Sequence, residues 1–115
     1  MQPEQYRVLV PYRSAYPDPI LFQKGEKIRI GREFSGDPDW KDWIWCEGEN
    51  RNTAWVPKQF IDGNGFCRRA YNARELTILT GEILTVTEIV NGFGWAQKAD
   101  GQTGWVPMKN LEKLS

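Results

Sequence analysis

The sequence contains no histidine and only 2 cysteines among its 115 residues. Without imidazole, catalysis by a histidine base and most catalytic zinc sites are excluded. Cys46 and Cys67 are spaced for neither a zinc motif nor a disulfide framework, so we expect both to be small buried apolar residues. No close pair of acids lies in an apolar stretch. We therefore expect neither an enzyme nor a bound cofactor or metal.

Net charge is also lacking, because 15 Lys and Arg residues balance 15 Asp and Glu residues. Such a chain has no general attraction for phosphate backbones or anionic lipid, so nucleic acid is not expected as a partner. No apolar run is long enough to cross a membrane, and the first residues lack the apolar centre of a signal peptide. We expect a soluble, cytoplasmic protein.

What the chain does contain is an internal repeat. Residues 43–57 align without a gap to residues 93–107, and both stretches end in Trp-Val-Pro. Upstream, the corresponding residues are Tyr12 and Tyr71, then Gly25-Glu26 and Gly81-Glu82. The second copy has shorter loops, in segments that are polar or rich in Gly, Pro and Asp, where length changes are tolerated. The pattern is that of a duplication.

Each copy reads as a set of short β-strands. Residues 27–30 and 83–89 alternate apolar and polar side chains with a period of two, and no helical stripe is present. About five short strands per copy, with no room for a crossover helix, indicate a small, strongly bent barrel. The predicted fold is therefore all-β, with two barrels in tandem at residues 1–62 and 66–115.

The motifs, taken in order, resemble those of the Src-homology-3 (SH3) family over almost the whole chain. Members begin with Ala-Leu-Tyr-Asp-Tyr, continue through Lys-Gly-Asp/Glu and Trp-Trp-x-Ala, and close with Gly-x-Ile/Val-Pro. The first copy offers Val8-Leu-Val-Pro-Tyr12, Lys24-Gly-Glu26, Trp43-Ile-Trp-Cys46 and Ala54-Trp-Val-Pro57. The second offers Cys67-Arg-Arg-Ala-Tyr71, Thr80-Gly-Glu82, Phe93-Gly-Trp-Ala96 and Gly104-Trp-Val-Pro107. The resemblance implies two five-stranded SH3-like barrels.

The resemblance further implies a protein-binding adaptor that holds a proline-rich, basic peptide across an aromatic groove. Carried over by position, the ligand-binding residues of the first copy are Tyr12, Asp18, Trp43, Pro57 and Phe60. Asp18 would attract an Arg or Lys of the ligand. Val10 replaces the first groove tyrosine, and Phe60 lacks the hydroxyl that a tyrosine would offer. A pocket with fewer hydrogen bonds is the expectation.

The second copy has lost more of the pattern. Its weaker candidates are Tyr71, Phe93 and Pro107, while Arg69 and Asn110 stand where the family has tyrosines. The acidic loop is reduced to Arg74-Glu75. We do not expect this copy to bind a proline-rich peptide by the usual route.

Two other functions use the same side chains. The 6 tryptophans and their aromatic neighbours would also suit a cage for a methylated ammonium, or a stacking face for a carbohydrate. Alternatively, the chain is a scaffold whose groove is covered by the other barrel or by a dimer mate. Binding that depends on charge but not on proline would favour the cage, and solution mass with the accessibility of Trp43 would identify the scaffold. The sequence leaves the oligomeric state open.

Overall fold

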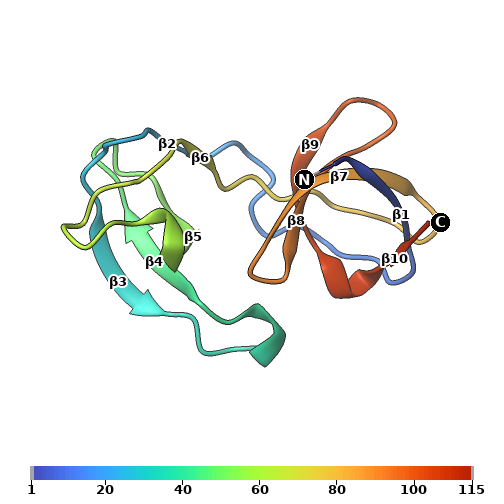
Figure 1. Ribbon diagram of the computed structural model, residues 1–115, viewed down its shortest axis with the longest axis horizontal. Helices are drawn as coiled ribbons and strands as arrows, with labels where there is room; N and C mark the ends of the chain where they lie inside the picture. The colour runs from blue at the N-terminus through green and yellow to red at the C-terminus, as the bar shows by residue number, and fades with distance from the viewer. Residues whose placement is uncertain (1, 115) are drawn as a thin grey trace. The chain divides into compact units, whose positions relative to one another are not determined.

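The computed structural model describes residues 2–114 and consists largely of short β-strands (Figure 1). The strands are β1 (Glu4–Val8), β2 (Leu21–Phe22), β3 (Arg29–Glu33), β4 (Trp43–Glu47), β5 (Thr53–Pro57), β6 (Tyr71–Asn72), β7 (Ile83–Val90), β8 (Phe93–Gln97), β9 (Thr103–Pro107) and β10 (Leu111–Lys113). Short 3-10 turns occur at η1 (Pro38–Trp40), η2 (Lys58–Phe60) and η3 (Met108–Asn110). The described residues include no α-helix and no helix able to span a membrane. The predicted all-β class is confirmed.

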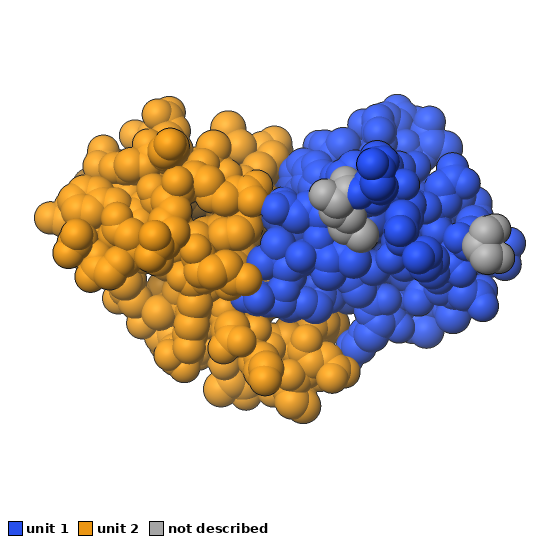
Figure 2. Space-filling model, viewed as in Figure 1, with its two compact units in different colours: residues 1–18, 74–115 blue, residues 19–73 orange. Residues whose placement is uncertain are grey.

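The chain forms two compact units (Figure 2). Unit 1 consists of residues 1–18 and 74–115, and unit 2 of residues 19–73. Unit 2 is thus a continuous segment inserted within the sequence of unit 1. The boundary predicted from the sequence, at residues 62 to 66, lies between the two repeats. The two compact units divide the chain after residue 18 and after residue 73 instead, so each repeat contributes residues to both units.

Unit 1 is built on an antiparallel sheet with the strand order β10-β1-β7-β8-β9. In β1, Tyr6 and Val8 are buried while Gln5 and Arg7 are exposed, which is the pattern of a strand with one face on a core. The core of unit 1 consists of Tyr6, Val8, Leu76, Ile78, Leu84, Val86, Ala96 and Val106. Fully burying a valine, leucine or isoleucine in such a core contributes about 1.5–3 kcal/mol.

The two passages of chain that lead to and from unit 2 run antiparallel inside unit 1. The Tyr12 amide donates to the Ile78 carbonyl at 3.0 Å, and the Ile78 amide donates to the Tyr12 carbonyl at 2.9 Å. Further along, the Glu75 amide donates to the Tyr16 carbonyl at 2.8 Å. The outgoing and returning segments are therefore fastened to each other before the chain crosses to unit 2.

Unit 2 combines the antiparallel sheet β3-β4-β5 with the short pair β2-β6. Its two ends meet, because Leu21 pairs with Asn72 and the Ala73 amide donates to the Ile20 carbonyl at 2.9 Å. The buried apolar residues of unit 2 include Phe22, Ile28, Trp43, Cys46, Ala54, Val56, Pro57, Phe60, Cys67, Tyr71 and Ala73. A segment that closes on itself in this way can be inserted into another fold without disturbing it.

The repeat found in the sequence is reproduced in three dimensions by the hairpins β4-β5 and β8-β9. Trp45 lies opposite Trp55, with ring centroids 5.2 Å apart at an interplanar angle of 72°. Trp95 lies opposite Trp105 at 5.3 Å and 71°. Cross-strand aromatic pairs of this edge-to-face kind stabilise a hairpin beyond the burial of their area.

Each unit takes its first strand from one repeat and its remaining strands from the other. Val8 of the first repeat lies in the unit 1 core with Ala96 of the second. Their counterparts, Cys67 and Cys46, both lie buried in unit 2. There, burial and the nearby Cys67 thiol raise the pKa of the Cys46 thiol to about 12. The first-strand segments of the two repeats have therefore changed places.

This exchange predicts which fragments fold. Residues 19–73 alone, and a chain that joins residues 1–18 to 74–115 through a short Gly-Ser linker, should each give dispersed amide spectra and a cooperative thermal transition, because each contains a complete unit. Fragments 1–62 and 66–115 serve as the comparison, and each lacks a strand that its unit requires. Cooperative unfolding of those two fragments, prepared separately, would show instead that each repeat closes on itself.

Candidate functional site

The residues expected to line one groove are divided between the two units. Of the first-copy candidates, Tyr12 and Asp18 belong to unit 1, whereas Trp43, Pro57 and Phe60 belong to unit 2. Of the second-copy candidates, Tyr71 belongs to unit 2, whereas Phe93 and Pro107 belong to unit 1. Each unit therefore has a mixed set, in which the tyrosine of one repeat joins the ring and proline of the other.

In unit 2 the mixed set is packed into the core. Tyr71 contacts Phe60 edge-on at 5.4 Å and stacks on Phe22 at 6.2 Å between ring centroids. The Tyr71 hydroxyl donates to the Trp55 carbonyl at 3.0 Å. Exposed fractions are only 6% for Trp43, 5% for Phe60 and 5% for Tyr71, and Pro57 is fully buried. These rings stabilise unit 2 and offer little surface to a ligand.

Arg69 adds a cation to this cluster. Its guanidinium carbon lies 4.4 Å from the centroid of the Phe60 ring, a cation–π contact. Arg69 and Phe60 stand at positions where the SH3 pattern has two groove tyrosines. Where the SH3 pattern has two tyrosines that bind a ligand, this chain therefore has an arginine and a phenylalanine that contact each other.

In unit 1 the corresponding set is partly open. Tyr12 contacts Phe93 edge-on with ring centroids 6.4 Å apart. Phe93 and Pro107 are buried, but Tyr12 is only half-buried and Val10 is 53% exposed. Buried Asn110 donates its side-chain amide to the Val10 and Pro11 carbonyls at 3.2 and 3.4 Å. The residue that replaces the last groove tyrosine therefore holds the backbone beside Tyr12 in place.

A carboxylate lies at one end of this set. Glu75 accepts hydrogen bonds through Oε1 from the Tyr12 hydroxyl at 2.9 Å and from the Ala15 amide at 3.4 Å. Burial raises the pKa of Glu75, and the two hydrogen bonds oppose that shift. Burial, together with the Glu75 charge, also raises the pKa of Tyr12. The two hydrogen bonds that stabilise the negative charge of Glu75 thus come from neutral donors.

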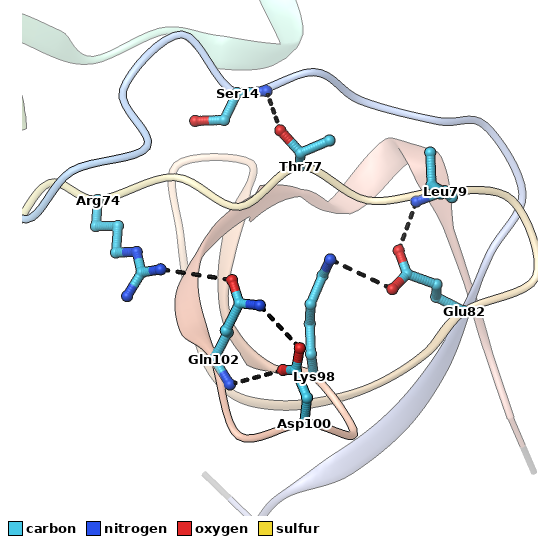
Figure 3. Close-up of polar contacts among 8 residues, drawn as sticks. All are labelled: Ser14, Arg74, Thr77, Leu79, Glu82, Lys98, Asp100 and Gln102. Carbon is cyan, nitrogen blue, oxygen red and sulfur yellow. Dashed lines mark hydrogen bonds and ion pairs between the residues drawn. The ribbon is translucent and has the colours of Figure 1, made fainter.

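Polar contacts fix the segment that carries Glu75 (Figure 3). On one side, the Ser14 amide donates to the Thr77 hydroxyl at 3.0 Å. On the other, Arg74 Nη2 donates to Gln102 Oε1 at 3.5 Å. Because Arg74 and Thr77 are held on either side of Glu75, the backbone that carries its carboxylate is positioned before any ligand arrives.

Glu75 was absent from the expected site, whereas Asp18 was included. Asp18 is exposed at the point where the chain leaves unit 1. The signal that identifies Glu75 was present in the sequence, since Arg74-Glu75 is all that remains of the acidic loop in the second copy. What the sequence did not show is that this remnant lies beside Tyr12 of the first copy.

A separate aromatic cluster in unit 2 contains a cation of the chain itself. The guanidinium carbon of Arg32 lies 5.6 Å from the ring centroid of Trp45 and 5.2 Å from that of Trp55. Phe34 contacts Trp55 edge-on at 5.4 Å. Three rings around a cation have the composition of an aromatic cage, and here Arg32 is the cation.

The described residues contain no group of three or more His, Cys, Asp or Glu side chains arranged to hold a metal ion. The two thiols are free and buried, as expected from the sequence. Burial, with smaller contributions from Glu26 and Asp62, raises the pKa of the Cys67 thiol to about 11.

The pair of Tyr12 and Glu75 predicts a change in stability. Tyr12→Phe removes the donor to a half-buried carboxylate and should lower the free energy of unfolding of unit 1 by about 1 kcal/mol. The measurement is urea unfolding followed by amide resonances of unit 1. A double-mutant cycle with Glu75→Gln should give a coupling energy of similar size, and additive effects would show that the contact contributes nothing.

The same carboxylate gives unit 1 a pH dependence. Because burial raises the pKa of Glu75, the folded state binds this proton more tightly, and stability is lost as pH rises through the folded-state pKa. Glu75→Gln should remove that loss, whereas Glu112→Gln, at an exposed acid, should not. Superimposable stability–pH curves for the wild type and Glu75→Gln would contradict this assignment.

The thiols should be unreactive in the folded protein. Since their pKa values lie well above 8, thiolate is scarce at pH 8, and burial restricts access as well. Iodoacetamide should label Cys46 and Cys67 slowly in buffer and rapidly in urea, as followed by mass spectrometry. Labelling of the native protein at the rate of a free cysteine would show that unit 2 is open at this point.

Comparison with known proteins bears on the second half of the chain. Residues 66–114 match the family described as variant SH3 domain. No curated protein and no solved structure matches the chain. The matched residues begin in unit 2 and continue in unit 1. The chain therefore contains a variant SH3 domain at residues 66–114, and domains of this class are generally non-catalytic modules that bind proteins or peptides.

Proposed function

We propose that this interaction module binds an extended, proline-containing segment with a basic residue on the surface of unit 1 formed by Val10, Tyr12 and Glu75, here called the Tyr12 face. One observation carries the proposal. Of the rings expected to bind a ligand, Trp43, Phe60, Tyr71 and Phe93 belong to buried residues, whereas Tyr12 is half-buried. A ligand that stacks on an aromatic surface would therefore reach Tyr12 more readily than the other rings.

The chemistry of the Tyr12 face suits such a ligand. A polyproline II segment has little backbone entropy left to lose, and its flat rings pack against aromatic and branched apolar side chains. Tyr12 and Val10 supply those two kinds of contact. Glu75 supplies a negative charge that would attract an arginine or lysine of the ligand, and the hydrogen bonds to its carboxylate come from neutral donors. Exposed Asp18 adds a second acid, on the outgoing segment that follows Tyr12.

This proposal moves the binding surface away from the groove expected on the first repeat. Trp43, Pro57 and Phe60 are buried in unit 2, and a ligand would reach their rings only after side chains had moved. The cage alternative requires a similar rearrangement, because Arg32 already lies over Trp45 and Trp55. Burial of the unit 2 rings is the observation that favours a scaffold without a free groove.

A peptide titration tests the proposal. Isotope-labelled protein is mixed with a proline-rich peptide that contains one arginine, and with the same peptide carrying norleucine at that position. We expect amide shifts at residues 10–18 and 75–78, and a roughly tenfold loss of affinity for Tyr12→Ala, which corresponds to about 1.4 kcal/mol. Glu75→Gln should weaken binding of the arginine peptide but not of the norleucine peptide.

Glu112→Gln provides the matched control, because this exposed acid of unit 1 lies in β10 and pairs with Arg7. It should leave both affinities unchanged. Amide shifts confined to residues near Trp43 would show that the peptide binds to unit 2 instead. The absence of any shift, at peptide concentrations in the millimolar range, would favour the scaffold function.

A further inference from the structure

Within the described residues 2–114, no strand pairs with the outer edge of β3, although the counterpart of β3 in unit 1 is paired on both sides. β3 lies at the edge of the sheet β3-β4-β5, and all five of its residues are exposed. Ile30 is 48% exposed. An edge strand presents unpaired backbone amides and carbonyls, which makes it a template for a further strand.

The duplication identifies what lies at this edge in the other unit. Ile30 pairs with Cys46, just as Val86 pairs with Ala96, and Cys46 corresponds to Ala96 in the repeat. Ile30 of β3 is therefore the counterpart of Val86 of β7. On its other side, Val86 lies opposite Glu4 of β1, and Val86 is fully buried where Ile30 is half exposed.

Unit 2 begins the same pairing and then stops. In unit 1, β1 pairs with β7 from Arg7 opposite Ile83 to Glu4 opposite Val86. In unit 2, Lys27 lies opposite Phe66 and the Ile28 amide donates to the Gly65 carbonyl at 2.8 Å, which reproduces only the start of that ladder.

A tight turn explains why the ladder ends there. The Asp62 carboxylate accepts hydrogen bonds from the amides of Asn64 at 2.8 Å and Phe66 at 3.0 Å. Gly65 has φ +85°, a left-handed conformation that glycine adopts without steric cost. The chain therefore turns back toward Ile61, and residues 62–65 do not extend along β3 as Glu4 and Gln5 extend along β7.

We propose that the open edge of β3, at Arg29 and Ile30, binds an extended acidic segment of a partner protein by strand addition. The segment runs antiparallel to β3, in the place that Glu4 and Gln5 occupy beside β7. New backbone hydrogen bonds along the edge stabilise the complex, and an apolar side chain of the partner covers Ile30. This site is independent of the Tyr12 face.

The charges along this edge define the chemistry of the partner. Arg29 has 84% of its side chain exposed, and its guanidinium lies 3.6 Å from Glu47 in an exposed ion pair of the kind that contributes little. Lys27, two residues earlier, is also exposed. Glu33, the acid of β3, is paired with Lys58 at 2.7 Å. The exposed side chains of Lys27 and Arg29 thus lie on one face of this edge, and Ile30 lies on the other. A partner residue directly opposite Arg29 projects to the face of the cations, so the acidic residue belongs opposite Arg29 and the apolar residue opposite Ile30.

The strand itself limits what can bind. The register of β3 with β4 shifts between Ile30 and Glu33, and such a bulge bends the edge and restricts the straight portion to a few residues. Charged side chains on an edge also discourage pairing with arbitrary strands. A short acidic segment fits these restrictions, whereas a long apolar strand does not.

The probe for this site is an acetylated and amidated acidic peptide, Thr-Val-Glu-Val-Thr, short enough to pair at Arg29 and Ile30 without reaching Lys27 and Ile28, where Gly65 and Phe66 already lie. Added to the full chain, it should shift the amides of residues 27–33 and slow their hydrogen exchange. A peptide with lysine in place of the glutamate should bind at least threefold more weakly.

Two variants of matched exposure give the control. Ile30→Lys places a charge on the open edge and should weaken peptide binding about tenfold. Ile89→Lys changes a strand isoleucine of unit 1 that is 44% exposed, close to the 48% of Ile30, and should leave binding unchanged. Equal effects of the two variants would overturn the proposal.

Two further results would also overturn it. Amide shifts at residues 83–90 and 111–113 alone would show that the peptide replaces β1 in unit 1. Protection of residues 29–33 that rises with protein concentration without peptide, together with dimers in sedimentation, would show that a second copy of the chain covers this edge.

Discussion

The antiparallel pairing of Tyr12 with Ile78 is the constraint on which the rest of the structure depends. Its two backbone hydrogen bonds fasten the outgoing chain to the returning chain inside unit 1, before and after the 55 or so residues of unit 2. The Tyr12 side chain adds a bond to Glu75 from the same pair of segments. The contact that closes unit 1 around the insertion therefore also brings together the ring and the acid of the Tyr12 face.

Much of the fold could be predicted from the sequence, because period-two patterns and turn residues are local signals. The strands of the two hairpins, the equivalence of Trp45–Trp55 with Trp95–Trp105 and the burial of both cysteines were of this kind. The exchange of first strands was not. An alternating pattern shows which face of a strand is buried, but Val8 and Cys67 are both small and apolar, and either suits either core.

One signal for the exchange lies between the two predicted barrels. The segment Asp62-Gly-Asn-Gly65 has the composition of a linker, but a short connection containing Gly and Asn is equally a hairpin signal. Such a turn returns Cys67 to Ile61 after a loop of few residues, at little entropic cost. The candidate site could be predicted only in part for the same reason. The sequence suggested Tyr12, but the residues that lie beside Tyr12 depend on which unit its segment joins.

The insertion of unit 2 within unit 1 also determines how the molecule would respond to mechanical tension. β1 and β10 are antiparallel neighbours, with Tyr6 opposite Lys113, so Glu4 and Lys113 lie at the same end of this strand pair. A force that pulls Glu4 and Lys113 apart would unzip the pair one hydrogen bond at a time. Unit 2 would carry no load until β1 and the Tyr12–Ile78 contact had been pulled away, so unit 1 would act as its mechanical shield.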